Sequence, residues 1–318
     1  MHEFEIIRRF FSGKITLQKD HVVIGPGDDC AVVRVPNNFE LCLSTDTFIE
    51  GVHFPFQAKP ALIASRLSAA NLSDLAAMGA EPFGFTLAIS SPEFTEHWLE
   101  EFSDQLEDDV EKYQNPLLGG NLSRGPLSLT MNIMGIVPTG TAILRSNAKV
   151  GDDIYVSGNL GDAAGGLALM EQIADQAVKN SSLLERYSSP VPRVDLGQAL
   201  RKIATAAIDI SDGFAADLGH LCEASGFGAQ INLEALPLST ELVRTFGLEV
   251  ARVKAIRGGD DYELCFTAEP DQASSIQQLS ECLKLKLTKV GKISHDKSVS
   301  IKDKLGSPFD EIEGYQHF

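Results

Sequence analysis

Residues 206–224 read AAIDISDGFAADLGHLCEA. The segment begins as an apolar strand and continues as an apolar helix from Gly213 onward. Asp209, Ser211 and Asp212 occupy the turn between the two elements, where the first amides of the helix favour an anion. A helix-capping role would explain Ser211 or Asp212, but it does not explain two carboxylates. A strand, a polar turn and a helix in this order predict a ligand-binding α/β unit.

The same alternation of elements extends along the chain of 318 residues. This length favours two domains of roughly 150 residues each. Turn residues cluster from Pro138 to Lys149, so we expect an N-terminal α/β domain over residues 1–146 and a C-terminal α/β domain over residues 147–318. Strands are expected at 22–24, 31–35, 41–44, 83–89, 127–137, 154–157, 206–210, 229–233, 262–267 and 286–293. Helices are expected at 60–78, 95–113, 162–172, 196–204, 213–224 and 271–282. The predicted fold class is α/β (α+β).

Composition limits the classes of function. The formal net charge is −17, so the basic surface that nucleic-acid binding requires is missing. The sequence lacks an apolar run of the ~20 residues that cross a bilayer, and its first residues lack a secretory signal. We therefore predict a cytoplasmic protein that binds neither nucleic acid nor membrane. The five cysteines are widely spaced, which predicts reduced core residues rather than disulfides or a zinc site.

Five short motifs place carboxylates beside glycine or small residues. They are GPGDD (25–29), STD (44–46), NLSD (71–74), DISDG (209–213) and GGDD (258–261). Oxygen ligands of this kind select Mg²⁺, which in proteins usually holds phosphates. The sequence contains neither the P-loop motif Gly-x-x-x-x-Gly-Lys-Ser/Thr nor the three-glycine motif of dinucleotide-binding Rossmann domains. The sequence therefore predicts an enzyme that handles phosphates through carboxylates and metal ions.

Each motif also has a simpler interpretation. Asp28 and Asp29 are compatible with a solvated turn, and Asp46, at the end of the expected strand, is compatible with a turn or cap. Asp74 lies late in a nearly uncharged helix, so it needs either a metal or a basic side chain from elsewhere. The segment 119–125, GGNLSRG, is typical of a flexible loop beside phosphates.

In order along nearly the whole chain, the motifs closely resemble those of the thiamine-monophosphate kinase family. They are GPGDDCA (25–31), STDT (44–47) with His53, NLSDLAAMGA (71–80), GGNLSRGP (119–126), DISDG (209–213) and GDDYELCF (259–266). That family belongs to a superfamily with aminoimidazole-ribonucleotide synthetase and selenophosphate synthetase. The resemblance implies two domains of mixed sheet and packed helices, and a homodimer formed through the N-terminal domains. It also implies transfer of the ATP γ-phosphate to thiamine monophosphate, assisted by several Mg²⁺ ions, to give thiamine diphosphate.

The resemblance further implies a role for particular residues. The implied metal ligands are Asp29, Ser44, Thr45, Asp46, Asp74, Asn121, Asp209 and Asp212. The implied ATP contacts are Gly120, Asn121, Arg145 and Ser211, and the implied thiamine contacts are His53, Asp260 and Phe318. Among these residues, Asp46, Asp74, Asp212 and Arg145 are the expected catalytic groups.

One residue departs from the family pattern. The family loop usually reads Gly-Gly-Asp, whereas this chain has Asn121. The amide oxygen still coordinates a metal but carries no charge, so we expect weaker affinity at one magnesium position. Three rival functions remain open from the sequence: a magnesium-dependent phosphohydrolase, another ATP-using synthetase of the superfamily, and a nucleotide sensor without catalysis.

Overall fold

The computed structural model describes residues 2–15, 17–172 and 181–309. Its contacts divide the chain into two units, one of Met1–Leu75 with Ala80–Gly140 and one of Ala76–Gly79 with Thr141–Phe318. The predicted boundary lies after residue 146, a few residues beyond the observed division between Gly140 and Thr141. Each unit contains one sheet with parallel and antiparallel neighbours, so the predicted fold class is confirmed. Among the described residues, no helix has the length and apolar character needed to cross a membrane.

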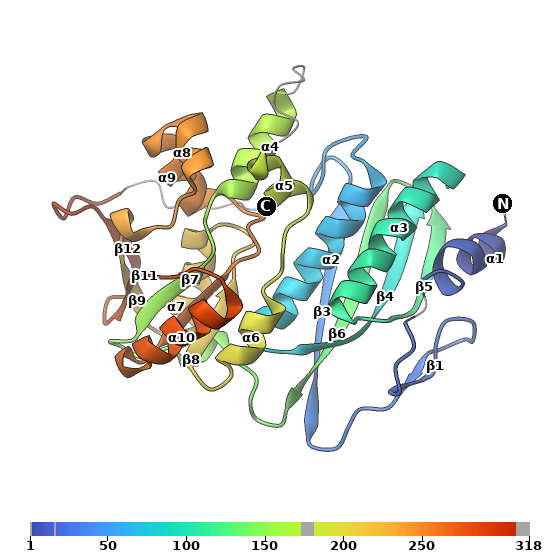
Figure 1. Cartoon of the computed structure of the whole chain (residues 1–318), viewed down its shortest axis with the longest axis horizontal. Coiled ribbons are helices and arrows are strands. Elements are labelled where there is room, and N and C mark those ends of the chain that lie inside the picture. Colours follow the sequence, from blue (N-terminus) through green and yellow to red (C-terminus); the bar gives the residue numbers. More distant parts are fainter. Residues whose placement is uncertain (1, 16, 173–180, 310–318) are drawn as a thin grey trace. The chain divides into compact units, whose positions relative to one another are not determined.

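The first unit is built on a four-stranded sheet with the order β3-β6-β4-β5. Its strands are β3 (Phe39–Ile49), β4 (Glu81–Ser91), β5 (Leu117–Arg124) and β6 (Ser128–Pro138), and β1 (Val22–Ile24) pairs separately with β2 (Val32–Val33). Its helices are α1 (Glu3–Ile6), η1 (Ile7–Ser12), α2 (Pro60–Ala77) and α3 (Glu96–Tyr113). Helices α2 and α3 cover one face of the sheet (Figure 1). Helix α3 starts where the Thr95 hydroxyl accepts a hydrogen bond from the Trp98 amide.

The second unit has a six-stranded sheet with the order β12-β9-β11-β7-β10-β8. Its strands are β7 (Asp153–Ser157), β8 (Ala204–Asp209), β9 (Gly228–Asn232), β10 (Leu264–Ala268), β11 (Leu287–Ser294) and β12 (Val299–Lys302). Its longer helices are α4 (Asp162–Gln172), α7 (Phe214–Ser225), α9 (Leu248–Arg257) and α10 (Ala273–Leu283). Its shorter helices are η2 (Arg145–Asn147), α5 (Ser182–Ser188), α6 (Val194–Leu200), η4 (Leu233–Ala235), α8 (Thr240–Phe246) and η5 (Pro270–Gln272). Helix α7 packs its apolar side chains into the core formed with β7, β8, β9 and β10.

Several sequence-based predictions were wrong. The segment 119–125 is not a flexible loop, because most of it belongs to strand β5, which pairs parallel to β4. Strand β3 is longer than expected, so Asp46 lies within the strand rather than at its end. The expected helix over 196–204 ends at Leu200, and β8 begins at Ala204. No disulfide joins the five cysteines, which all lie in the described part of the chain, and Cys30 and Cys282 are exposed rather than in the expected core.

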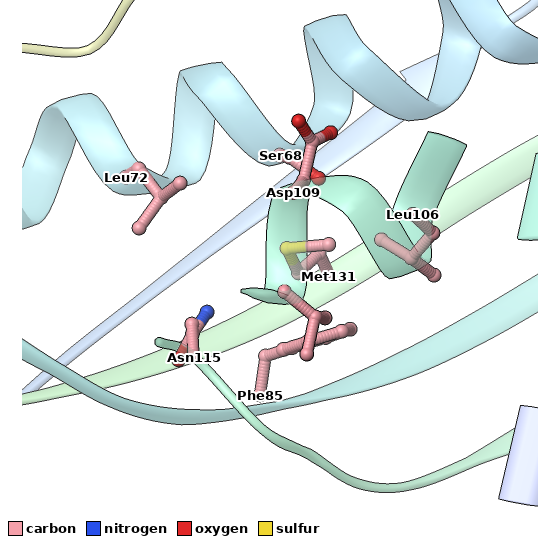
Figure 2. Close-up of a pocket in the computed structure, with 8 residues that line it drawn as sticks. Ser68, Leu72, Phe85, Leu106, Asp109, Asn115 and Met131 are labelled. Atoms are coloured by element: carbon pink, nitrogen blue, oxygen red, sulfur yellow. The ribbon is translucent and has the colours of Figure 1, made fainter. Parts of the chain in front are cut away.

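A buried carboxylate lies between helices α2 and α3. Asp109 of α3 lines a cavity of about 10 Å³ together with Ser68, Leu72 and Asn115 (Figure 2). Such a cavity holds about one water molecule. Among the described residues, Asp109 Oδ2 and Asn115 Oδ1 are buried without a hydrogen-bond partner. Burial raises the pKa of Asp109 to about 6, despite hydrogen bonds from Ser68 and Gln105 that lower it.

We expect the Asp109→Asn variant to be more stable than the wild type at pH 8. Because the pKa of Asp109 is higher in the folded chain, folding favours its neutral form, and this contribution is lost as the pH rises through about 6. A pKa rise of this size corresponds to at most about 3 kcal/mol. Urea unfolding at pH 8 and pH 4.5 measures the difference, which should shrink at the lower pH. An equal stability difference at both pH values would contradict a raised pKa of Asp109 in the folded chain.

Candidate functional site

Three predicted metal ligands of the first unit converge on one side of its sheet. Side chains two positions apart in a strand share a face, so Ser44 and Asp46 of β3 point the same way. The Ser44 hydroxyl donates a hydrogen bond to the Asp74 carboxylate in the last turns of α2. Asp74 is half-buried rather than buried. A hydroxyl and two carboxylates therefore gather where β3 faces α2, which is the kind of oxygen set that suits Mg²⁺.

Thr45 is not brought together with this group. Its side chain lies on the opposite, exposed face of β3, where its hydroxyl accepts a hydrogen bond of 2.6 Å from Asn132 Nδ2. Asn132 lies directly opposite Thr45 on strand β6. Thr45 therefore cannot place its hydroxyl beside the side chains of Ser44 and Asp46.

His53 follows strand β3 in a tightly held turn. Its Nδ1 accepts a hydrogen bond of 3.0 Å from the Ile49 amide, and its ring stacks on Phe48 with 5.4 Å between the centroids. The buried Arg66 donates to the His53 carbonyl oxygen at 3.3 Å. Because Nδ1 is an acceptor, the neutral ring carries its proton on Nε2. The two contacts therefore fix the orientation of the His53 ring and of its Nε2–H group. No pattern in the sequence indicated that Arg66 would hold this turn.

Gly120 and Asn121 lie on the edge strand β5, opposite Leu87 and Ala88 of β4. A Cβ atom at position 120 would come within 2.0 Å of the Leu87 carbonyl oxygen. The close approach of two strands therefore requires the glycine, independently of any nucleotide. The neighbouring cavity, lined by these residues and by the N-terminal helices, measures about 50 Å³. It has room for a few water molecules but not for ATP.

Asp29 lies exposed in the turn after β1. Its amide donates a hydrogen bond of 2.9 Å to the Asp28 carboxylate, which matches the turn interpretation of this motif. A turn interpretation does not exclude a ligand role, because the Asp29 carboxylate remains exposed.

In the second unit, strand pairing continues past the end of β8 and brings four predicted residues together. Asp209 pairs with Leu264, and beyond it the Ile210 amide donates to the Glu263 carbonyl oxygen at 2.8 Å. The Asp260 amide then donates to the Ser211 carbonyl oxygen at 2.9 Å. The end of β8 thus carries Asp209, which is buried, and the two loops beyond the strands carry the side chains of Ser211, Asp212 and Asp260.

A residue that the sequence analysis did not single out shapes this turn. Asp217 of α7 accepts hydrogen bonds at its Oδ2 from the amides of Ser211, Asp212 and Gly213, at 3.0, 3.1 and 3.1 Å. Its side chain is only 3% exposed. Burial, followed by the neighbouring Asp212 charge, raises the pKa of Asp217 to about 7, although the three amides lower it.

The occupied amides limit what the turn offers to a ligand. The chain's own carboxylate accepts the N–H groups of Ser211, Asp212 and Gly213, which precede Phe214, the first residue of α7, so the expectation about the first amides of the helix itself stays a prediction. The turn therefore presents carboxylates rather than amides to a ligand. An aspartate in the first turn of a helix is a common signal in sequences, and it is compatible with many other roles.

Arg145 lies away from the other predicted residues of its unit. Its carbonyl oxygen accepts a hydrogen bond of 2.8 Å from Ser225, the last residue of α7. Asp212 precedes the first residue of the same helix, and twelve residues of helix span about 18 Å. The structure therefore does not bring Arg145 to Ser211 and Asp212. Phe318 lies outside the described residues.

The predicted acidic ligands are divided between the two units. Asp46 and Asp74 converge in the first unit, and Asp209 and Asp212 lie close together along the chain in the second. Accordingly, the described part of the chain has no group of three or more His, Cys, Asp or Glu side chains arranged to hold a metal ion. The oxygen donors present in each unit nevertheless fit the preference of Mg²⁺ for carboxylates and hydroxyls.

Comparison with protein families places this arrangement in a known class. The N-terminal domain of AIR synthase related proteins matches residues 27–137, and the C-terminal domain of these proteins matches residues 149–304. Two mixed sheets with acidic motifs at their edges thus define a two-domain protein of the AIR synthase related class.

More closely related proteins narrow the assignment. Thiamine-monophosphate kinase of Escherichia coli (strain K12) is 43% identical over 320 residues, covering 99% of this chain and 98% of that protein. The crystal structure of thiamine-monophosphate kinase from Stenotrophomonas maltophilia K279a has a TM-score of 0.88 and 44% identity, covering 94% of this chain and 96% of that chain. AaThiL complexed with AMPPCP and TMP has a TM-score of 0.78 and 29% identity, covering 99% and 96%. The chain belongs to the thiamine-monophosphate kinase family, as its motifs predicted.

We expect Asp217→Leu to lower the free energy of unfolding by about 2–4 kcal/mol, because three amides lose their acceptor. Asp217→Asn keeps one acceptor oxygen and buries no charge, so we expect less than half of that loss. Denaturant unfolding of both variants at pH 8 measures these values. If the asparagine and leucine variants were equally destabilised, the contribution of Asp217 to stability would not come from its hydrogen bonds with the three amides.

Proposed function

We propose that the chain transfers the γ-phosphate of ATP to thiamine monophosphate and thereby forms thiamine diphosphate. The observation that carries this proposal is its full-length similarity to thiamine-monophosphate kinases, including one structure that contains AMPPCP and TMP. The acidic motifs support the same conclusion, because each unit presents oxygen ligands rather than a lysine-bearing phosphate loop.

Charge neutralisation is the main task of such a site. ATP and a chain with a net charge of −17 repel each other unless cations lie between them. Opposite unit charges 4 Å apart attract by about 4 kcal/mol at an effective dielectric constant of 20. We assign Mg²⁺ binding to Ser44, Asp46 and Asp74 in the first unit and to Asp209 and Asp212 in the second. Asp29, Asn121 and the backbone of Thr45 are further ligands in this proposal.

The reaction needs no catalytic base. The second pKa of a phosphate monoester is about 6, so the acceptor phosphate is largely dianionic near neutral pH. Bound Mg²⁺ supplies positive charge to the phosphates. The protein's part is to hold the acceptor oxygen in line with the γ-phosphate while Asp46, Asp74 and Asp212 fix the metal positions. Transfer is then direct, without a phosphorylated protein.

The two substrates have separate contacts in this proposal. Gly120, Asn121 and Ser211 contact ATP. Arg145 also contacts ATP in this proposal, at a position distant from Asp212. Asp260 lies near the cationic ring of thiamine, and His53 donates a hydrogen bond from Nε2. Phe318 is assigned to the thiamine moiety on the sequence resemblance alone.

We also propose that the chain is a homodimer and works in the cytoplasm. The face of β3 that α2 does not cover carries exposed apolar side chains, among them Leu41, Leu43 and Ile49, which are 40%, 63% and 41% exposed. Apolar side chains gathered on one face favour contact with a second copy. Membership of the thiamine-monophosphate kinase family supports the cytoplasm.

Incubation with ATP, Mg²⁺ and thiamine monophosphate should yield ADP and thiamine diphosphate in equal amounts. We expect Asp74→Asn to lower kcat at least a hundredfold, because the ligand loses its charge. The matched control is Asp108→Asn, an exposed carboxylate on α3. Phosphate release without thiamine diphosphate would instead identify a phosphohydrolase, and nucleotide binding without turnover would identify a sensor.

Asn121 gives a separate test of the metal assignment. Asn121→Asp adds a charged ligand, so we expect half-maximal activity at a roughly tenfold lower Mg²⁺ concentration, equivalent to about 1.4 kcal/mol. Asn147→Asp adds the same charge at an exposed position of η2 and serves as the control. An unchanged magnesium dependence in Asn121→Asp would show that this side chain is not a ligand.

A further inference from the structure

The segment 258–263, GGDDYE, has an unusual backbone for non-glycine residues. Asp260 has a φ of 69° and Tyr262 a φ of 49°, so both lie in the left-handed region. This region is sparsely populated by residues with a side chain, and it persists only where neighbouring contacts impose it. The Tyr262 hydroxyl donates a hydrogen bond of 3.1 Å to Asp260 Oδ1. The conformation of the segment therefore determines where the Asp260 carboxylate lies.

The two residues that alternate with these are completely buried acids. Asp261 and Glu263 are both 0% exposed. Asp261 accepts hydrogen bonds from the amides of Gly161 at 2.6 Å and Ala163 at 3.1 Å, where α4 begins. This contact fastens the middle of the segment to the N-terminus of a helix.

Glu263 is the centre of a second anchor. It accepts hydrogen bonds from Arg186 Nη2 at 2.8 Å, from Arg193 Nε at 2.7 Å and from the Ser157 hydroxyl at 2.5 Å. The same Arg186 nitrogen also donates to the Asp261 carbonyl oxygen at 3.1 Å. Arg186 therefore links both ends of the stretch that contains Tyr262, and it does so from α5, a different part of the chain.

The space around Glu263 is fitted to this arrangement. A Cβ atom at position 158 would lie 2.1 Å from Glu263 Oε1, and Gly158 has a φ of 60°. The chain thus has a glycine where a side chain would displace the carboxylate. Two guanidinium groups, a hydroxyl and this glycine surround one buried carboxylate that the proposed reaction does not use.

We propose that the ion cluster of Arg186, Arg193 and Glu263 positions Asp260 for recognition of the cationic part of the acceptor substrate. This inference rests on the proposed function, because Asp260 is assigned there to the thiamine moiety. The cluster contacts no reacting group, and it acts by holding the left-handed backbone at Asp260 and Tyr262. Its loss should weaken binding of the acceptor more than binding of ATP or the chemical step.

The kinetic test replaces Arg186 by methionine. We expect the KM for thiamine monophosphate to rise at least tenfold, while kcat and the KM for ATP change less than threefold. Arg186→Lys keeps the charge but not the guanidinium group that contacts Glu263 and the Asp261 carbonyl oxygen. Its KM for thiamine monophosphate should lie between those of the wild type and Arg186→Met. Arg244→Met, the same change at an exposed position of α8, should leave all three constants unchanged. A fall in kcat together with similar rises in both KM values would mean that Arg186 is merely structural and would overturn the inference.

Hydrogen–deuterium exchange supplies a readout that does not depend on activity. In the wild type, the amides of Asp260 and Tyr262 donate to the carbonyl oxygens of Ser211 and Ile210, both at 2.9 Å. Arg186→Met, or Arg186→Lys if the methionine variant does not fold, should expose these two amides to exchange while β7 stays protected. Unchanged protection at Asp260 and Tyr262 would overturn the anchoring role. A wild type that does not phosphorylate thiamine monophosphate would refute the proposed function, while the exchange measurement would still decide the anchoring.

Discussion

The buried carboxylate of Asp217 determines what the turn after β8 offers to a ligand. Three consecutive amides in the turn before α7 bind its Oδ2, so they are not available to a phosphate. What the turn presents instead are the side chains of Ser211 and Asp212, next to Asp209, which is only 3% exposed at the end of β8. An acidic chain that uses these turn amides internally needs cations to hold a nucleotide there. The proposed dependence on Mg²⁺ follows from this constraint.

The two units support their functional side chains in different ways. In the second unit, backbone pairing between β8 and β10 continues into the loops. Buried side chains then hold those loops through hydrogen bonds. In the first unit, the proposed ligands lie on regular elements, with Ser44 and Asp46 within β3 and Asp74 on α2. Side chains on strands and helices need little further support, whereas side chains on loops require anchors such as Asp217 and Glu263.

The sequence predicted the elements whose signals are local. Helix α2 and strands β4 and β6 have continuous apolar patterns, and they were found close to their observed bounds. Strand β5 was missed because its glycines are typical of loops. Gly120 is required only by the approach of β4, whose Leu87 carbonyl oxygen would lie 2.0 Å from a Cβ at that position. Strand β3 was predicted too short because its second half carries the polar residues of the candidate site.

The sequence indicated the residues that we propose as ligands, and it did not indicate the residues that support them. Acidic motifs identified Asp74, Asp209 and Asp212 because carboxylates beside small residues have few structural explanations. Asp217 and Glu263 gave no such signal, since their partners are backbone amides or arginines distant in the sequence. Such contacts depend on the folded chain, which a single sequence does not display.

The central claim is that the acidic motifs accept nucleotide only through Mg²⁺, and calorimetric titration with a non-hydrolysable ATP analogue tests it most directly. With millimolar Mg²⁺ the analogue should bind, and with EDTA its affinity should fall at least a hundredfold. Equal affinity in the two titrations would show that the protein binds the phosphates without metal ions, and it would contradict the account.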